Sequence, residues 1–174
     1  MTNIHFVWHF FLMLQSVAFK MSYQTKKTLL FMSYEDRFNN VARLYDGEIS
    51  LHRLRGSHCC VVGLGGVGSW VCEGLIRSGV GSITLIDHDD ICISNINRQL
   101  QALSSTVGQF KADALKNRLL DINPEADINI MYDFIRADNI YSIMNRLNRT
   151  INCMIDAADG VSDKAVSCLL IYIT

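Results

Sequence analysis

The sequence predicts an α/β fold, with a doubly wound, mainly parallel sheet and helices on both faces. Three observations favour it. From residue 33 onward, short apolar runs alternate with segments of helical periodicity. A glycine-rich turn joins the first apolar run to the first helical segment. Pro124 is the only proline in the 174 residues, and no linker, repeat or low-complexity tract breaks the alternation.

The first two strands flank the glycine turn and one helix. Residues 57–62 are an apolar run that enters glycines, which is typical of a buried parallel strand. Residues 66–78 then have the apolar spacing of a helix, and residues 82–87 form the second apolar run. Strand, helix and strand in this order predict a parallel pair joined by a right-handed crossover.

The later elements repeat this order. Residues 108–122 carry apolar side chains at helical spacing, and Asn123-Pro124 ends that helix. A strand, a helix, a strand and the start of a last helix follow at residues 127–131, 138–147, 151–156 and 162–172.

Composition narrows the class of protein. Lys and Arg number 16 against 17 Asp and Glu, a net charge of −1, so any contact with RNA must be local. The six cysteines include no C-x-x-C pair, and we expect Cys59, Cys60, Cys72 and Cys153 to pack in the core. A reduced, cytoplasmic protein is therefore expected rather than a disulfide scaffold.

Residues 1–31 differ in character from the rest of the chain. The apolar stretch at residues 4–19 is shorter than the roughly 20 residues of a membrane-spanning helix, and it lacks the basic start and cleavage site of a signal peptide. We expect no stable membrane association. Met32 opens a segment typical of a cytosolic start, so residues 1–31 are interpreted as a non-native or disordered extension of residues 32–174.

Gly63, Gly65 and Gly68 reproduce the pattern G-x-G-x-x-G, and Asp87 ends the next strand about 20 residues later. This is the fingerprint of a Rossmann-like nucleotide site. Gly63 permits a tight turn, Gly65 lets a phosphate or ribose approach the backbone, and Gly68 lets the helix pack closely on the strand. The amide groups at that helix start favour an anion. The alternative is a glycine turn with an acidic strand end and no ligand.

The fingerprint does not separate a nicotinamide dinucleotide from ATP, so the following segment decides. Asn95, Arg98 and Lys111 are polar residues that follow the second strand. A triphosphate carries more negative charge than a bridging pyrophosphate and recruits extra cations. Lys111 lies near a helix start, where the macrodipole favours anions, and a phosphate partner would explain it. Taken singly, each of Arg98 and Lys111 is better interpreted as a solvated surface charge.

Five segments carry a family resemblance, and they occur in family order within residues 37–165: RLYDG, VVGLGGVGS, LIDHDDICISNINRQ, VGQFKA and DAADG. The chain resembles the ThiF/MoeB/HesA superfamily of ubiquitin-activating-like adenylating enzymes. Within it, VGSW, DAADG and an RLYDG segment without a preceding RQ are most similar to the branch of tRNA threonylcarbamoyladenosine dehydratases. Residues 32–174 would then be the N-terminal, nucleotide-binding part of a ThiF-type domain.

The resemblance implies ATP-dependent adenylation of a carboxylate, which in this branch is that of threonylcarbamoyladenosine in tRNA. Implied cofactor-binding residues are Gly63, Gly65, Gly66, Gly68, Asp87, Asp89, Asn95, Arg98 and Lys111. Implied catalytic residues are Arg98, Lys111 and Asp159, and Asp159 would hold Mg²⁺. The implied partners are ATP, a tRNA bound mostly by segments beyond this chain, and a second copy in a homodimer. No catalytic cysteine is implied.

Departures from the family pattern leave alternatives open. Asn40 stands where adenylating relatives with R-x-x-R-Q have an arginine, so the roles of Arg37 and Arg43 stay undecided. The chain ends at CLLIYIT, where the family continues with further strands, and we expect a C-terminal truncation that leaves the sheet incomplete. Two other functions stay open: an adenylyltransferase that activates a ubiquitin-like sulfur carrier, and an inactive nucleotide-binding fragment.

Overall fold

The computed structural model describes residues 33–44, 46–136, 138–147 and 150–159. The interpreted extension at residues 1–31 and the helix predicted at residues 162–172 lie outside these ranges. The chain divides into two compact units between Arg37 and Phe38. Only residues 33–37 of the first unit are described, and they form the start of a helix. The second unit contains the sheet and its helices.

From residue 58 onward, strands and helices alternate as the sequence predicts. In chain order they are α2 (Tyr34–Leu44), α3 (Glu48–Arg55), β1 (His58–Val62), α4 (Gly68–Arg77), β2 (Ser82–Ile86), the short 3₁₀ helix η1 (Ile93–Asn95), α5 (Lys111–Ile122), β3 (Asp127–Met131), α6 (Ile140–Leu147) and β4 (Cys153–Asp156). Within the described ranges, no helix is both long and apolar enough to cross a bilayer.

The four strands form one parallel sheet in the order β3-β2-β1-β4. The registers pair Val62 at the end of β1 with Ile86 at the end of β2 and with Asp156 at the end of β4. The chain adds strands on one side of β1 and then crosses to its other side. Ligands of doubly wound sheets bind at such a switch point, beyond the carboxyl ends of the strands. The predicted fold class is confirmed.

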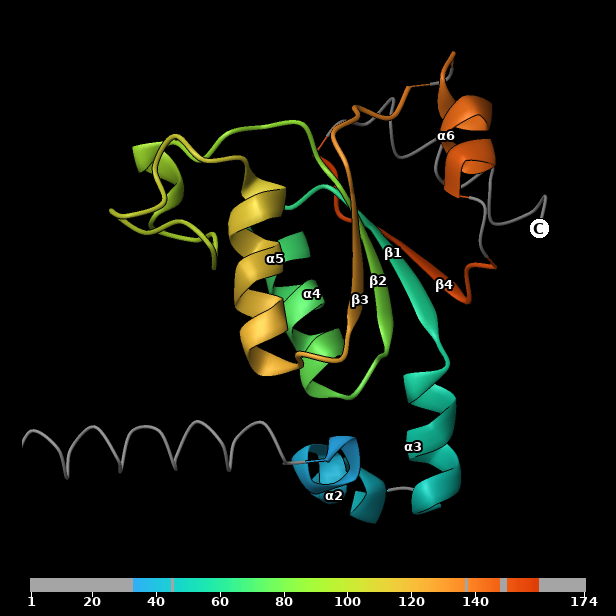
Figure 1. The fold of residues 1–174 in the computed structure, drawn as a ribbon. Helices are drawn as coiled ribbons and strands as arrows, with labels where there is room; N and C mark the ends of the chain where they lie inside the picture. Colours follow the sequence, from blue (N-terminus) through green and yellow to red (C-terminus); the bar gives the residue numbers. More distant parts are fainter. Residues whose placement is uncertain (1–32, 45, 137, 148–149, 160–174) are drawn as a thin grey trace, which may run out of the picture. The chain divides into compact units, whose positions relative to one another are not determined.

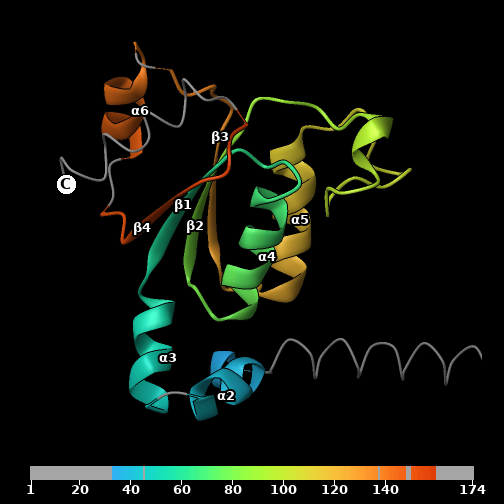
Figure 2. The same cartoon turned by 180° about the vertical axis from the view of Figure 1, so that it is seen from behind.

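Helices cover both faces of this sheet (Figures 1 and 2). Cys59 and Val61 of β1 belong to a core shared with α4 and α5, whereas the alternate residues Cys60 and Val62 belong to a second core shared with α6. Successive side chains of a strand point to opposite faces, so a strand buried on both faces must be apolar throughout. β1 is buried along its whole length.

The predicted helices begin earlier than the observed ones. α4 starts at Gly68 instead of residue 66, and α5 starts at Lys111 instead of residue 108. Gly108 has a φ of 86°, which a right-handed helix does not contain. In both places the residues that were assigned to the helix instead form the loop that precedes it, next to the strand ends.

The cysteines of β1 and α4 pack in the core, as expected. Burial raises the pKa of Cys59 to about 11, of Cys60 to about 12 and of Cys72 to about 12. These thiols stay protonated at neutral pH and are not nucleophiles. The expectation for Cys153 is wrong, because this residue is exposed. It lies on β4, the edge strand of the described sheet.

An ion-pair network joins α4 to α5. The buried Glu73 of α4 accepts hydrogen bonds from Arg118 of α5 at 2.5 Å and from Arg77 at 2.8 Å. The hydrogen bond from Arg118 is the main reason why the pKa of Glu73 lies below its usual value. A carboxyl group with a lowered pKa stabilises the fold above the pKa that it has in the unfolded chain. That contribution is lost as the pH falls through the folded pKa.

We expect Glu73→Gln to lower the free energy of unfolding at pH 7 by about 1–2 kcal/mol, since it leaves two guanidinium groups without their carboxylate. The difference from the unmodified chain should stay constant above the ordinary pKa of a glutamate, about 4.3, and close only as the pH falls through the lowered pKa of Glu73 in the folded chain. Urea unfolding at several pH values measures it. Glu125→Gln is the matched control, because the Arg55–Glu125 pair is exposed on both sides. An equal loss in both variants would contradict the network's role.

Candidate functional site

Each glycine of the fingerprint occupies a different environment. Gly63 has a φ of 82°, and a side chain there would lie 2.9 Å from the backbone nitrogen of Ala158. A Cβ atom on Gly68 would lie 1.8 Å from the carbonyl oxygen of Gly63, so the helix packs directly on the strand end. Gly65 is different, because nothing lies within 4 Å of where its Cβ would be. Its open side faces the pocket that it lines.

The carboxylate of Asp87 joins the glycine loop to the loop after β2. One oxygen accepts the N–H of Leu64 at 2.6 Å, and the other accepts the N–H of Asp89 at 2.8 Å. Asp87 is only 9% exposed, so both bonds form in a largely water-free setting. Each oxygen keeps a lone pair that can accept a further donor from a ligand.

Lys111 is the first residue of α5 and is buried. Its Nζ lies 2.6 Å from Asp89 Oδ2, and its backbone N–H donates to the carbonyl of Asp89 at 3.0 Å. The alternative interpretation of Lys111 as a solvated surface charge is therefore wrong. The ion pair holds a cation at a helix start, where the macrodipole alone would disfavour it.

Asn95 and Arg98 come from the segment around η1. The side-chain oxygen of Asn95 accepts the N–H of Cys92 at 3.0 Å, which fixes the carboxamide at the pocket wall. Arg98 donates to the carbonyl of Ser94 at 3.0 Å. Its aliphatic stem lies over Gly66, where a Cβ would be 3.4 Å from the Cγ of Arg98. A Cβ atom on Gly66 would therefore be in van der Waals contact with the stem of Arg98.

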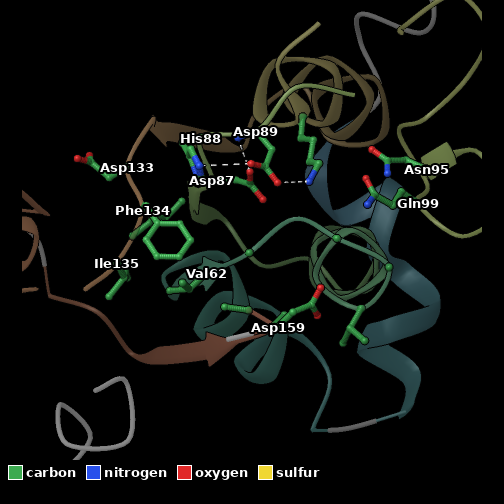
Figure 3. A pocket seen from close by; sticks show the side chains of 18 of the residues that line it. Val62, Asp87, His88, Asp89, Asn95, Gln99, Asp133, Phe134, Ile135 and Asp159 are labelled. Carbon is green, nitrogen blue, oxygen red and sulfur yellow. Dashed lines mark hydrogen bonds and ion pairs between the residues drawn. The ribbon is translucent and has the colours of Figure 1, made fainter. Parts of the chain in front are cut away.

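These residues surround one pocket with a cavity volume of about 580 Å³. Figure 3 shows Asp87, His88 and Asp89 between two groups of side chains: Asp133, Phe134 and Ile135 lie on one side, and Asn95 and Gln99 on the other. Lys111 lines the same pocket and pairs with Asp89. The pocket thus has an end with apolar side chains and an end with amide and cationic groups.

The predicted site residues meet here. Gly63, Gly65, Gly66, Asp87, Asp89, Asn95, Arg98, Lys111 and Asp159 all line the pocket. Gly68 is the exception: it is the first residue of α4 and packs against the backbone of Gly63 in the loop.

The carboxylates of the pocket differ in their availability to a metal ion. Oxygen atoms of Asp87 and Asp89 lie within 4.8 Å of each other and of a nitrogen of His88. Asp87 already accepts two backbone N–H groups, and Asp89 already neutralises Lys111. Asp159 lines the same pocket, and in the described part of the structure its carboxylate has no hydrogen-bond or ion-pair partner.

The sequence interpretation missed His88, Phe134 and Ile135, which line the pocket, and Gln101, which contacts the glycine loop. His88 packs edge-on against Phe134 with ring centroids 5.1 Å apart. A signal for Phe134 and Ile135 existed, since they follow β3 and the carboxyl ends of parallel strands meet at one edge. Gln101 had no such signal, because it follows no strand and belongs to no motif.

Known proteins are similar to this chain in sequence and in fold. The tRNA threonylcarbamoyladenosine dehydratase of Haemophilus influenzae is 52% identical over 133 residues, which are 76% of this chain and 49% of that protein. The Escherichia coli protein of the same name is 45% identical over 76% of this chain and 48% of its own. The crystal structure of E. coli tRNA N6-threonylcarbamoyladenosine dehydratase in complex with ATP matches with a TM-score of 0.74 and 43% identity, over 79% of this chain and 56% of that chain.

The chain spans about half the length of the curated relatives that it matches. The model of the ThiF family matches residues 38–166, a range that contains the sheet, the glycine loop and every residue named at the pocket. The chain belongs to the ThiF family.

Proposed function

We propose that the chain is the nucleotide-binding part of an ATP-dependent adenylating enzyme, a tRNA threonylcarbamoyladenosine dehydratase. One observation carries the adenylation: a buried lysine, Lys111, lines the same pocket as the glycine loop. A hydride-transferring site has no use for that cation. The substrate is proposed from the two dehydratases at 52% and 45% identity, and the sulfur-carrier alternative is therefore set aside.

The two ends of the pocket suit the two ends of ATP. Phe134 and Ile135 would contact the adenine, and Asp87 would accept from ribose hydroxyls with its remaining lone pairs. The phosphates would lie toward Gly65, Arg98 and Lys111. Backbone N–H groups at the start of α4 favour an anion in that place.

The proposed chemistry needs charge neutralisation more than proton transfer. An oxygen of the substrate carboxylate attacks the α-phosphorus, pyrophosphate leaves, and an acyl adenylate forms. Arg98 and Lys111 would stabilise the charge that moves onto the leaving pyrophosphate, and Asn95 would orient the phosphates. A group within the activated side chain then attacks the acyl carbon, which closes a ring and releases AMP. The sum of the two steps removes one water from the substrate.

Mg²⁺ fits the residues present. Mg²⁺ prefers one or two carboxylates together with phosphate oxygens and water, and Asp159 is the pocket carboxylate without a protein partner in the described ranges. We propose that Asp159 holds Mg²⁺ against the phosphates. The ion would offset the negative charge of the triphosphate.

The remaining parts of the proposal concern the whole protein. tRNA would be bound mostly by segments beyond this chain, because the chain carries a net charge of −1. We propose a homodimer and a cytoplasmic location from the family, and residues 32–174 as the nucleotide-binding part of the domain.

We expect the chain to release pyrophosphate from ATP and Mg²⁺ when it is given tRNA that contains threonylcarbamoyladenosine, and not when the tRNA lacks that modification.

Lys111→Met should lower ATP affinity roughly 10- to 100-fold, as the loss of a charged hydrogen bond worth about 1.5–3 kcal/mol predicts. Lys116→Met, which removes the same charge one and a half turns along α5, should not change it. Equal ATP affinity in both variants would contradict the assignment of Lys111.

Asp159→Asn should remove most of the gain in ATP affinity that Mg²⁺ gives, a change of roughly tenfold or about 1.4 kcal/mol. Titrations with ATP in Mg²⁺ and in a chelator measure this gain for each variant. Asp133→Asn is the control, because this substitution removes the same charge from the other end of the pocket. A full Mg²⁺ effect in Asp159→Asn would show that the ion binds elsewhere.

A further inference from the structure

Leu64, in the middle of the glycine loop, is held from both sides. Its N–H donates to Asp87 Oδ2 at 2.6 Å, and its carbonyl oxygen accepts from Gln101 Nε2 at 2.8 Å. Gln101 is only 2% exposed. The backbone carbonyl of Gln101 accepts a hydrogen bond from the hydroxyl of Thr106 at 2.7 Å, so the segment that carries Gln101 is also held in place.

The bond to Gln101 determines where the next N–H points. The carbonyl of Leu64 and the N–H of Gly65 belong to one peptide group, which is planar and trans, so they point in opposite directions. With the carbonyl held toward Gln101, the N–H of Gly65 points away from it. In the described part of the chain this N–H has no hydrogen-bond partner, and Gly65 lines the pocket.

A restraint is needed here because the loop is permissive. Gly65 lacks a Cβ and is therefore little restricted in φ, so the peptide between Leu64 and Gly65 can rotate more easily than it could before any other residue. The rotated peptide would turn a carbonyl oxygen toward the phosphate site and repel an anion. It would also break the hydrogen bond from Gln101 Nε2 to the carbonyl of Leu64, and a new bond would form only if the buried Gln101 amide turned over together with the peptide.

The bonding of Gln101 argues against a purely stabilising role. Its Oε1 is buried without a partner in the described ranges, and an unpaired buried acceptor destabilises a fold. The acceptor at Leu64 requires the amino group on that side, so turning the amide over would only exchange one unpaired group for a repulsion. The residue thus orients one peptide while it leaves its own oxygen unpaired.

We infer that Gln101 is a positioning residue for nucleotide binding: it holds the Leu64–Gly65 peptide so that the Gly65 N–H faces the phosphates. The inference rests on the proposed binding of ATP. Gln101 would touch neither substrate nor nucleotide and would act only through the peptide.

The test compares Gln101→Met with the unmodified chain. Methionine keeps the length and volume of the side chain and removes both the donor and the unpaired oxygen. We expect unchanged or higher stability in urea, an ATP affinity roughly tenfold lower, as expected for about 1.4 kcal/mol, and an unchanged affinity for adenosine. The residual dipolar coupling of the Gly65 N–H should change, while those of β1 and β2 stay the same. Gln109→Met, at an exposed glutamine that also donates to a backbone carbonyl, is the control.

Equal losses for ATP and adenosine, or no loss for ATP, would overturn the inference. If the unmodified chain binds no ATP, the proposed function fails, and the dipolar coupling then decides about Gln101 alone. A Gly65 coupling that is the same in Gln101→Met and in the unmodified chain would overturn the positioning role.

Discussion

One buried carboxylate, that of Asp87, connects the two loops on which the pocket depends. It fixes Leu64 in the glycine loop and Asp89 in the loop after β2, and Asp89 in turn holds Lys111. The position of the cation at the start of α5 therefore depends on Asp87, which follows β2 more than 20 residues earlier in the chain. The residue that the fingerprint assigns to the ribose is thus also a structural link, and its remaining lone pairs are what a ribose would meet.

The sequence predicted the parts of this structure that depend on local pattern. Each predicted strand agrees with the observed one to within two residues, because buried parallel strands are continuous apolar runs. The helices α2 and α3 were not predicted; in α3 only Leu51 is buried, so the apolar spacing of that helix is weak. The glycine loop, Asp87 and Lys111 could be placed because each follows a strand or begins a helix. Gln101 could not be placed, because its hydrogen bond to Leu64 joins residues of two different loops.

The charges of the pocket suit a nucleotide that arrives with a cation. Its lining carries more acidic than basic residues, namely Asp87, Asp89, Asp133 and Asp159 against Arg98 and Lys111. Lys111 is already paired with Asp89, so a bare triphosphate would meet repulsion and would have to compete for that lysine. Hydrogen bonds from the glycine loop do not remove this repulsion. In the proposed function Mg²⁺ at Asp159 does, which links the metal to nucleotide binding as well as to turnover.

The proposed function requires that the glycine fingerprint, which is also typical of dinucleotide sites, binds ATP in this chain. Calorimetric titration of the folded chain with ATP and Mg²⁺, and separately with NAD⁺, tests it most directly. We expect heat of binding with ATP and none with NAD⁺, because the cationic end of the pocket suits a triphosphate. Binding of NAD⁺ at least as tight as that of ATP would contradict it, and so would binding of neither by a chain whose circular dichroism shows the fold.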